Sequence, residues 1–318
     1  MNKLSPSLID KLTKFATLFL FLFIPLYPKL PLLDIAYTWV YIRLEDIVIA
    51  VVVGLYVARR AIPKDNPLLA PILMYWAVGF VSTLISITII GRTIWHYFPH
   101  LTILHFLRRI EYMVVFFIAA STIRGPRDIV HYIGAFGITT LLVNGYAYAQ
   151  KYLQYPAFLT MNEEFSKGEA LILTESSRIA STFAGHYDLA AYLVFSIVLF
   201  ISLVLGLRNV FVRVLLIFAS LASGIVLLWT QSRNSLLALG AALFCVIWWH
   251  KKKALLIPIV VAGIIALPIV FRSSDRYAKT FQYRRVLFDS RAGLPAGAAQ
   301  MGSDGRVTIE ESASPGVD

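Results

Sequence analysis

Residues 189–230 read LAAYLVFSIVLFISLVLGLRNVFVRVLLIFASLASGIVLLWT and hold two long apolar stretches, Leu189–Leu205 and Phe211–Thr230, separated by a short connection. Apolar stretches of about 17 to 25 residues have the length that an α-helix needs to cross a hydrocarbon layer about 30 Å thick. No water reaches backbone N–H and C=O groups inside that layer, so each stretch must satisfy them within its own helix. This part of the sequence therefore predicts two neighbouring transmembrane helices.

The rest of the chain has the same character. Hydrophobic residues make up 58% of the 318 residues, charged residues make up 15%, and the mean hydropathy is +0.72. These values are too apolar for a soluble domain of this length. We predict an all-α, polytopic membrane helix bundle with about nine spans, eight or ten being the alternatives. The other predicted spans are Leu12–Tyr27, Asp46–Val57 (with a possible start upstream, around Ala36–Tyr41), Pro67–Ile90, Thr102–Ile123, Ile129–Gln150, Ser235–Trp249 and Leu255–Phe271.

The Lys and Arg residues orient the predicted bundle. With the N-terminus in the cytoplasm, the short inner connections carry thirteen of these residues and the longer outer connections carry seven. Cytoplasmic loops are enriched in Lys and Arg, so we predict a cytoplasmic N-terminus. The net charge of +11 then indicates contact with anionic membrane lipids, and we expect no nucleic acid as a partner. The single cysteine, Cys245, lies within a predicted span and excludes a disulfide framework.

The spacing of the spans divides the chain into four regions. Residues 1–150 form an N-terminal transmembrane region of five helices, and residues 151–187 form an extracytoplasmic loop. Residues 188–271 form a second transmembrane region of four helices, and residues 272–318 form an extracytoplasmic tail. The loop is the longest internal connection, and connections of this length commonly carry function.

The end of this loop holds the first candidate motif, SSRIASTFAGHYDLAAYL, which contains Arg178. An arginine at the edge of a bilayer is costly to place, which suggests an anionic ligand. The motif also supplies two hydroxyls, a glycine for a tight turn and a carboxylate placed to cap the next helix, from Ser181, Thr182, Gly185 and Asp188. Such a turn before a helix N-terminus is suited to bind phosphate. The alternative is an ordinary capped loop whose arginine extends to water.

The second motif, LLWTQSRNSLLAL, joins two apolar spans through the turn Gln231-Ser232-Arg233-Asn234. So short a turn holds Arg233 close to both the membrane surface and the helix bundle. A guanidinium in that place suits two-pronged binding of a phosphate. The alternative is again an interfacial arginine that extends to water.

Together the two motifs resemble those of the O-antigen ligase and Wzy O-antigen polymerase superfamily. The resemblance covers residues 178–271 well and the N-terminal spans only by their general layout. It rests on one segment, followed by one span, followed by a Ser-Arg turn that opens the next helix. The residues that carry it are Arg178, Ser181, Thr182, Phe183, Gly185, Ala190, Ala191, Tyr192, Leu193, Ser232 and Arg233.

The resemblance implies a metal-independent glycosyltransferase, multi-pass in the bacterial inner (plasma) membrane. Its partners would be an undecaprenyl-diphosphate-linked glycan as donor, a glycolipid or a lipid-linked glycan as acceptor, and membrane lipids, with no cofactor. Arginines of such enzymes hold the diphosphate, which assigns catalytic roles here to Arg233 and Arg178. A histidine in a large external loop acts as general base. The residues expected to bind the diphosphate are Ser232, Ser181, Thr182, Gly185 and Arg109.

The chain departs from the family pattern in two respects. Gly185-His186-Tyr187-Asp188 stands where the family usually has a Gly-Asn-Pro-Asn-like run, and the chain ends at Asp318, where the large external loop would begin. We therefore expect a truncated member that lacks the loop histidine and is incomplete for catalysis. His186 is a candidate base in place of that histidine.

Charged residues within the fourth span have two interpretations. Arg108 and Glu111 are three residues apart and could pair on one helix face. Alternatively, Arg109 or Arg108 faces a cavity of the outer leaflet and helps to bind the diphosphate. The histidines near the outer face have no carboxylate or second histidine at ligand spacing, so we expect no metal site.

A transporter of lipid-linked glycans, a flippase, is the alternative function. It would also need basic residues in a membrane cavity. However, it predicts internal repeats with paired broken helices and basic residues through the depth of the cavity. We find no repeat, and the basic residues gather at the outer end of the bundle. A purely structural membrane subunit would leave the arginine turn unexplained.

Overall fold

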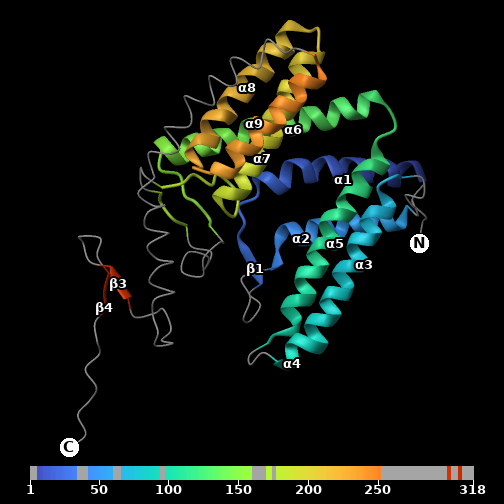
Figure 1. Cartoon of the computed structure of the whole chain (residues 1–318). Coiled ribbons are helices and arrows are strands. Elements are labelled where there is room, and N and C mark those ends of the chain that lie inside the picture. The colour runs from blue at the N-terminus through green and yellow to red at the C-terminus, as the bar shows by residue number, and fades with distance from the viewer. Residues whose placement is uncertain are drawn as a thin grey trace, which may run out of the picture. The chain divides into compact units, whose positions relative to one another are not determined.

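A computed structural model of the chain describes residues 6–33, 42–59, 66–93, 97–159, 170–173, 177–251, 299–301 and 307–309. The chain divides into two compact units, residues 1–259 and 260–318. The first unit contains all the described helices (Figure 1). They are α1 (Pro6–Leu26), α2 (Leu44–Ala58), α3 (Leu69–Ile85), α4 (Gly91–Thr93), α5 (Pro99–Thr122), α6 (Pro126–Tyr152), α7 (His186–Gly206), α8 (Val210–Trp229) and α9 (Arg233–Trp249).

Every predicted span that falls on described residues coincides with a helix. The span predicted at Pro67–Ile90 is α3 followed by a π-helical turn, Ser86–Ile90, and by α4. The ninth predicted span, Leu255–Phe271, lies outside the described residues. The second predicted span is α2, which begins at Leu44 after the short strand Ile42–Arg43; its suggested upstream start, Ala36–Tyr41, lies outside the described residues.

Four helical segments of the described chain are long and apolar enough to cross a membrane: Leu69–Thr93, Pro126–Tyr152, His186–Gly206 and Val210–Trp229. Helix α9 is apolar but has only 17 residues. Large apolar side chains also cover much of the outside, and Phe15, Phe211 and Leu237 are 72%, 78% and 70% exposed. A surface of this kind fits contact with lipid, since soluble monomers rarely show large apolar patches.

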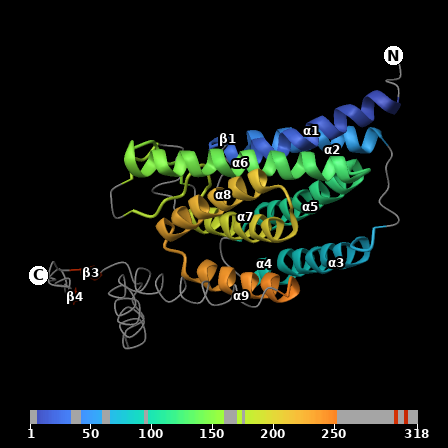
Figure 2. The same cartoon turned by 90° about the horizontal axis from the view of Figure 1, so that it is seen from above.

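Helix α6 connects the two halves of the first unit. It packs against α1 on one side and against α7 and α8 on the other (Figure 2). Buried polar side chains reinforce this packing: the Asn144 amide donates to Ser223 Oγ at 2.8 Å, and Thr140 Oγ1 lies 2.9 Å from Tyr192 Oη. Hydrogen bonds of this kind hold helices together in apolar surroundings. The predicted region 1–150 and the described part of the region 188–271, which ends at Lys251, therefore lie within one compact unit.

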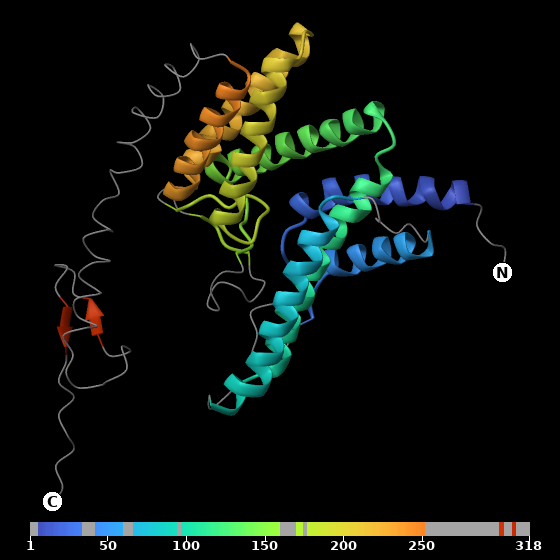
Figure 3. The same cartoon turned by 45° about the vertical axis from the view of Figure 1, so that its right-hand side comes forward.

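On the other side of the unit, α5 lies alongside α3, as Figure 3 shows, and also packs against α1 and α2. A small apolar core formed by Leu20, Ile49, Val52 and Ile118 lies between α1, α2 and α5. The larger core surrounds α7 and includes Val143, Leu193 and Leu227.

Short strands occur in the connections, where the all-α prediction had none. Strands β1 (Pro31–Leu33) and β2 (Ile42–Arg43) pair antiparallel between α1 and α2. In the second unit, β3 (Ala299–Met301) pairs antiparallel with β4 (Val307–Ile309). These strands have two or three residues each, too few to give the alternating pattern by which strands are recognised in a sequence.

The two ends of α6 meet different polar clusters. Asp128 lies in the first turn of α6 and pairs with Lys14 of α1, whereas Gln150 lies near the end of α6 and bonds to the loop before α7. The rise of an α-helix places these two residues about 33 Å apart. That separation matches the thickness of a bilayer's hydrocarbon layer, about 30 Å.

The predicted orientation can be tested by labelling the two ends of α9. In a Cys245→Ser background, we expect cysteine at the exposed position Asn234 to react with a membrane-impermeant maleimide in intact cells. Cysteine at the exposed position Lys251 should react only after the membrane is permeabilised. The reverse pattern would contradict a cytoplasmic N-terminus.

Candidate functional site at the α6–α7 and α8–α9 turns

The segment before α7 is held rigidly against α6 through Ser181. Its backbone N–H donates to Gln150 Oε1 at 2.8 Å, and its carbonyl accepts from Gln150 Nε2 at 3.0 Å. The Ser181 hydroxyl donates to the Val143 carbonyl at 2.7 Å. Ser181 is buried and has a φ of 52°, so its side-chain bond helps to stabilise a left-handed conformation that most residues avoid.

Two further bonds attach the same segment to α1 and α8. The Thr182 hydroxyl donates to the Pro25 carbonyl of α1, and the Ile179 N–H donates to the Trp229 carbonyl at the end of α8, at 3.3 Å. Ile179 and Ala180 are buried, and Ile179 belongs to the larger core. Arg178 directly precedes Ile179, the first of these anchored residues, so the backbone of Arg178 is also fixed in place.

The side chain of Arg178 contacts His186, the first residue of α7. Arg178 Nη1 lies 2.7 Å from His186 Nε2. A guanidinium can only donate, so His186 accepts at Nε2 and carries its proton on Nδ1. Arg178 Nε is buried and has no hydrogen-bond partner among the described atoms, and no described carboxylate forms an ion pair with Arg178. One buried N–H of this arginine is therefore available to an acceptor.

The α8–α9 turn is shorter than predicted. Helix α8 ends at Trp229 and α9 begins at Arg233, so the connection comprises only Thr230, Gln231 and Ser232. Gln231 takes the left-handed conformation, with a φ of 54°. Ser232 is the residue before the helix, is buried, and lies 2.8 Å from Ser235 through their Oγ atoms. Arg233 is half-buried in the first turn of α9.

The first turn of helix α9 is cationic. The first turn of α9 contains no Asp or Glu, although it contains Arg233. The N-terminus of a helix already carries the positive end of the helix dipole, so a cation there is unfavourable and an anion is favoured. Free N–H groups at a helix N-terminus also bind phosphate directly. This end of α9 is therefore suited to an anionic ligand.

The structure brings the two predicted motifs together. The Ile179–Trp229 backbone bond joins the residue after Arg178 to the end of α8, one short turn before Arg233. Phe183, Trp229 and Leu236, which come from both motifs, pack on the same core. Arg178, Ser232 and Arg233 therefore lie at one end of the helix unit, on a backbone that α1, α6 and α8 hold in place.

Other predicted site residues have different places. The donor hydrogens of Ser181 and Thr182 are already given to backbone carbonyls, so these residues position the turn instead of offering a hydroxyl to phosphate. Gly185 precedes α7 in an extended conformation, and the left-handed residue is Ser181. The prediction that Asp188 caps α7 was wrong: Gly185 is the cap residue, and Asp188 lies in the first turn of the helix.

The charged residues of α5 also differ from the prediction. Arg108 forms its recorded ion pair with Asp46 of α2, at 3.1 Å, and Glu111 Oε1 is buried without a hydrogen-bond partner among the described atoms. The predicted Arg108–Glu111 ion pair is therefore not formed. Arg109 is exposed on α5, whose main packing partners are α1, α2 and α3, and not α7, α8 or α9.

A charged cluster that the sequence analysis did not single out lies beside this site. Lys29 follows α1 and pairs with Glu45 of α2, and Arg43 Nη1 contacts the other oxygen of Glu45 at 3.2 Å. Lys29 and Glu45 are both buried. The charges of Lys29 and Arg43 also act on Asp188 at the start of α7. The signal in the sequence was Arg43-Leu44-Glu45-Asp46, a charged run that opens an apolar helix.

Comparison of the chain with protein-family models, with curated proteins and with solved structures gave no match. The function of the chain is therefore inferred from its residues and their geometry, together with the resemblance of its two motifs to those of the O-antigen ligase and polymerase superfamily.

Substitutions at the Lys29–Glu45 ion pair test how much it contributes to the stability of the fold. Burial lowers the pKa of Lys29, and the Glu45 carboxylate acts in the opposite direction. We expect Glu45→Gln to reduce the free energy of unfolding by about 3–5 kcal/mol, because it leaves two cations without their shared carboxylate. Lys29→Met should cost less, because Glu45 keeps Arg43.

The matched control is the double variant Lys29→Met/Glu45→Gln, which should recover part of the loss. Thermal or denaturant unfolding of the purified protein in one detergent measures all three variants. A Glu45→Gln variant as stable as the native protein would show that the pair contributes nothing to the fold.

Proposed function

We propose that the chain is a glycosyltransferase of the O-antigen ligase and polymerase type, multi-pass in the bacterial inner membrane. Its donor is a glycan on undecaprenyl diphosphate, and its acceptor is a lipid-core sugar or a lipid-linked glycan. The proposal includes a cytoplasmic N-terminus and about nine spans, so that the α6–α7 and α8–α9 turns face outward, where such donors are used.

The observation that carries the proposal is the arrangement of Arg178 and Arg233. One has a buried N–H with no acceptor among the described atoms, and the other opens a helix whose first turn has no acidic residue. Both features favour an anion at the same end of the unit. Two guanidinium groups on a fixed backbone suit a diphosphate, because each can grip a phosphate with two parallel N–H groups.

The same arrangement suits the chemistry of glycosyl transfer. The acceptor hydroxyl attacks the anomeric carbon, the bond from that carbon to the diphosphate oxygen breaks, and the diphosphate leaves with the bonding electrons. Negative charge therefore develops on the oxygens that Arg178 and Arg233 would hold. Cationic donors fixed in advance stabilise such a transition state without having to reorganise. The Ser232 hydroxyl and the N–H groups in the first turn of α9, which have no intrahelical acceptor, add hydrogen-bond donors.

The acceptor hydroxyl must lose its proton to a base. His186 is a poor choice for this role, because its Nε2 lone pair is occupied by Arg178 and its Nδ1 carries the proton. We assign His186 instead to holding the Arg178 guanidinium in place. In the family whose motifs this chain resembles, the base is a histidine of an external loop. We assign no residue of this chain to that role.

The first test concerns Arg233. In lipid nanodiscs we expect Arg233→Ala to weaken binding of undecaprenyl diphosphate and to slow transfer of a glycan from an undecaprenyl-diphosphate-linked donor. The cost should be about 3–4 kcal/mol, a rate loss of roughly a hundredfold to a thousandfold. Arg233→Lys should also be impaired, since an ammonium cannot reproduce the planar grip of a guanidinium. Arg178→Ala should reduce transfer to a smaller extent.

Arg208→Ala is the matched control, because this exposed arginine lies at the other end of α8. It should bind and transfer as the native chain does. Near-native donor binding by Arg233→Ala at equal expression would contradict the proposal. A fluorescent lipid-linked glycan can be followed as it crosses the membrane of proteoliposomes. If the chain moves it, and neither Arg233→Ala nor Arg178→Ala changes that movement, the flippase is favoured instead.

The second test separates the positioning role of His186 from a base role. His186→Gln keeps an acceptor for Arg178 and should retain donor binding and most of the transfer rate. His186→Phe removes the acceptor and should weaken donor binding. Titration with undecaprenyl diphosphate, followed by the pH dependence of transfer, measures both effects. A His186→Gln chain that binds donor normally but no longer transfers would show that His186 is the base.

A further inference from the structure

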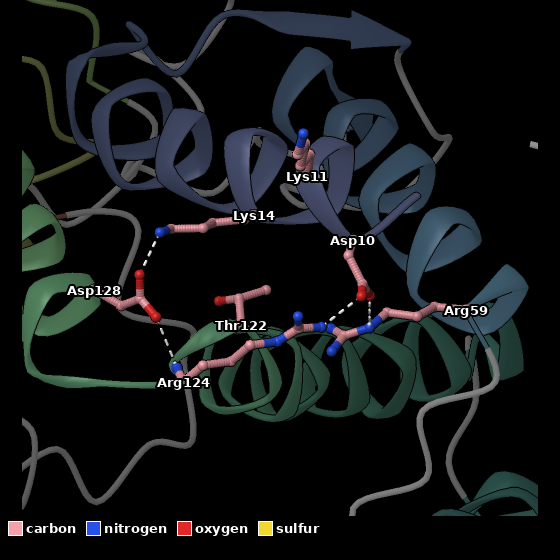
Figure 4. Close-up of a pocket in the computed structure, with 7 residues that line it drawn as sticks. All are labelled: Asp10, Lys11, Lys14, Arg59, Thr122, Arg124 and Asp128. Carbon is pink, nitrogen blue, oxygen red and sulfur yellow. Dashed lines mark hydrogen bonds and ion pairs between the residues drawn. The ribbon is translucent and has the colours of Figure 1, made fainter. Parts of the chain in front are cut away.

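A second polar site lies at the opposite end of α6. The cavity there has a volume of about 290 Å³ and lies among the start of α1, the end of α2 and the α5–α6 turn (Figure 4). Four cationic and two anionic side chains line it, so its formal charge is +2. They are Lys11, Lys14, Arg59, Arg124, Asp10 and Asp128.

Each carboxylate of the cavity is already shared by cationic or N–H groups. Asp10 accepts from Arg59 Nε and from Arg124 Nη2, both at 2.5 Å. Asp128 pairs with Lys14 and also accepts the backbone N–H of Arg124 at 2.8 Å. These bonds fix the geometry of three cations around the cavity (Figure 4). They do not neutralise it, because the cations outnumber the carboxylates by two.

Lys11 contributes charge without using a carboxylate. It is exposed and has no ion pair or hydrogen bond recorded with any described residue. On α1, Lys11 shares one face with Leu8 and Phe15, which are three residues before and four residues after it. Leu8, Leu12 and Phe15 are 42%, 40% and 72% exposed. An exposed apolar stripe therefore runs along α1 beside the cationic cavity.

We propose that this cavity binds the phosphate headgroup of an acidic phospholipid, whose acyl chain lies along Leu8, Leu12 and Phe15. The surplus of two positive charges attracts the phosphate, and Lys11 can donate to it without losing an ion pair. The cavity volume lies at the small end of ligand pockets, which suits a glycerophosphate and not a whole lipid. The apolar stripe accounts for the rest of the molecule.

A soluble phosphate would use the same cations but would gain nothing from the stripe. The position of the cavity also favours a lipid, because it lies one bilayer thickness along α6 from the outer turns. Basic residues near a membrane surface attract anionic lipids by about 1 kcal/mol per charge. The charge and the stripe together therefore point to phosphatidylglycerol or a related anionic lipid, in preference to a zwitterionic one.

Native mass spectrometry of the purified full chain tests this site, with equal amounts of phosphatidylglycerol and phosphatidylcholine of the same acyl chains. We expect preferential retention of phosphatidylglycerol. Lys11→Gln should weaken its binding about fivefold and Lys11→Glu about 25-fold, as one and two charge units are removed. Lys11 is exposed, so these variants should fold normally. Lys251→Gln, which removes an exposed lysine after α9, should bind as the native chain does.

Competition experiments separate the lipid from a soluble phosphate. Inorganic phosphate and glycerol 3-phosphate at millimolar concentration should not displace the bound phosphatidylglycerol. Displacement by either would overturn the assignment to a lipid. Equal retention of the two lipids, or equal losses in the Lys11 and Lys251 variants, would overturn the site itself.

Discussion

The two-way hydrogen bond between the Gln150 amide and the backbone of Ser181 is the interaction on which the candidate site depends. It fixes the loop before α7 to the end of α6, and the Ser181 hydroxyl adds a third bond to the same helix. A buried amide that lost these partners would remain unsatisfied, which makes the interaction costly to break. Arg178 has a defined place because the residues after it cannot move.

The charges of the molecule are organised differently in three polar regions. Around Lys29, Glu45 and Arg43, two cations share one buried carboxylate. Around Arg178 and the start of α9, cations meet helix N-termini instead. The cavity near Asp128 lies between these cases, with ion pairs that fix its geometry and a remaining positive charge.

Most of the helical layout could be predicted from the sequence, because a span of apolar residues has a length set by the bilayer. The placement of both motifs at one end of the helix unit could also be anticipated, because both lie in predicted outer connections. The roles of individual residues could not. Ser181 and Thr182 are suited by type to bind phosphate, but their hydroxyls are used by carbonyls of α6 and α1, and sequence spacing does not reveal such long-range partners. The same applies to Arg108, whose partner Asp46 lies 62 positions earlier in the chain.

Four described non-glycine residues are left-handed, and two of them, Ser181 and Gln231, lie in the candidate site and differ in what their conformation yields. A non-glycine residue in this region carries a conformational cost of about 1–2 kcal/mol. At Ser181 a glycine would remove that cost but would also remove the hydroxyl bond to Val143, so the strain there is coupled to a contact. At Gln231, substitution by glycine would remove no side-chain hydrogen bond to a described residue. The α8–α9 turn is therefore a place where the substitution Gln231→Gly can relieve conformational strain, and where the greater backbone freedom of glycine would loosen the direction in which Arg233 points.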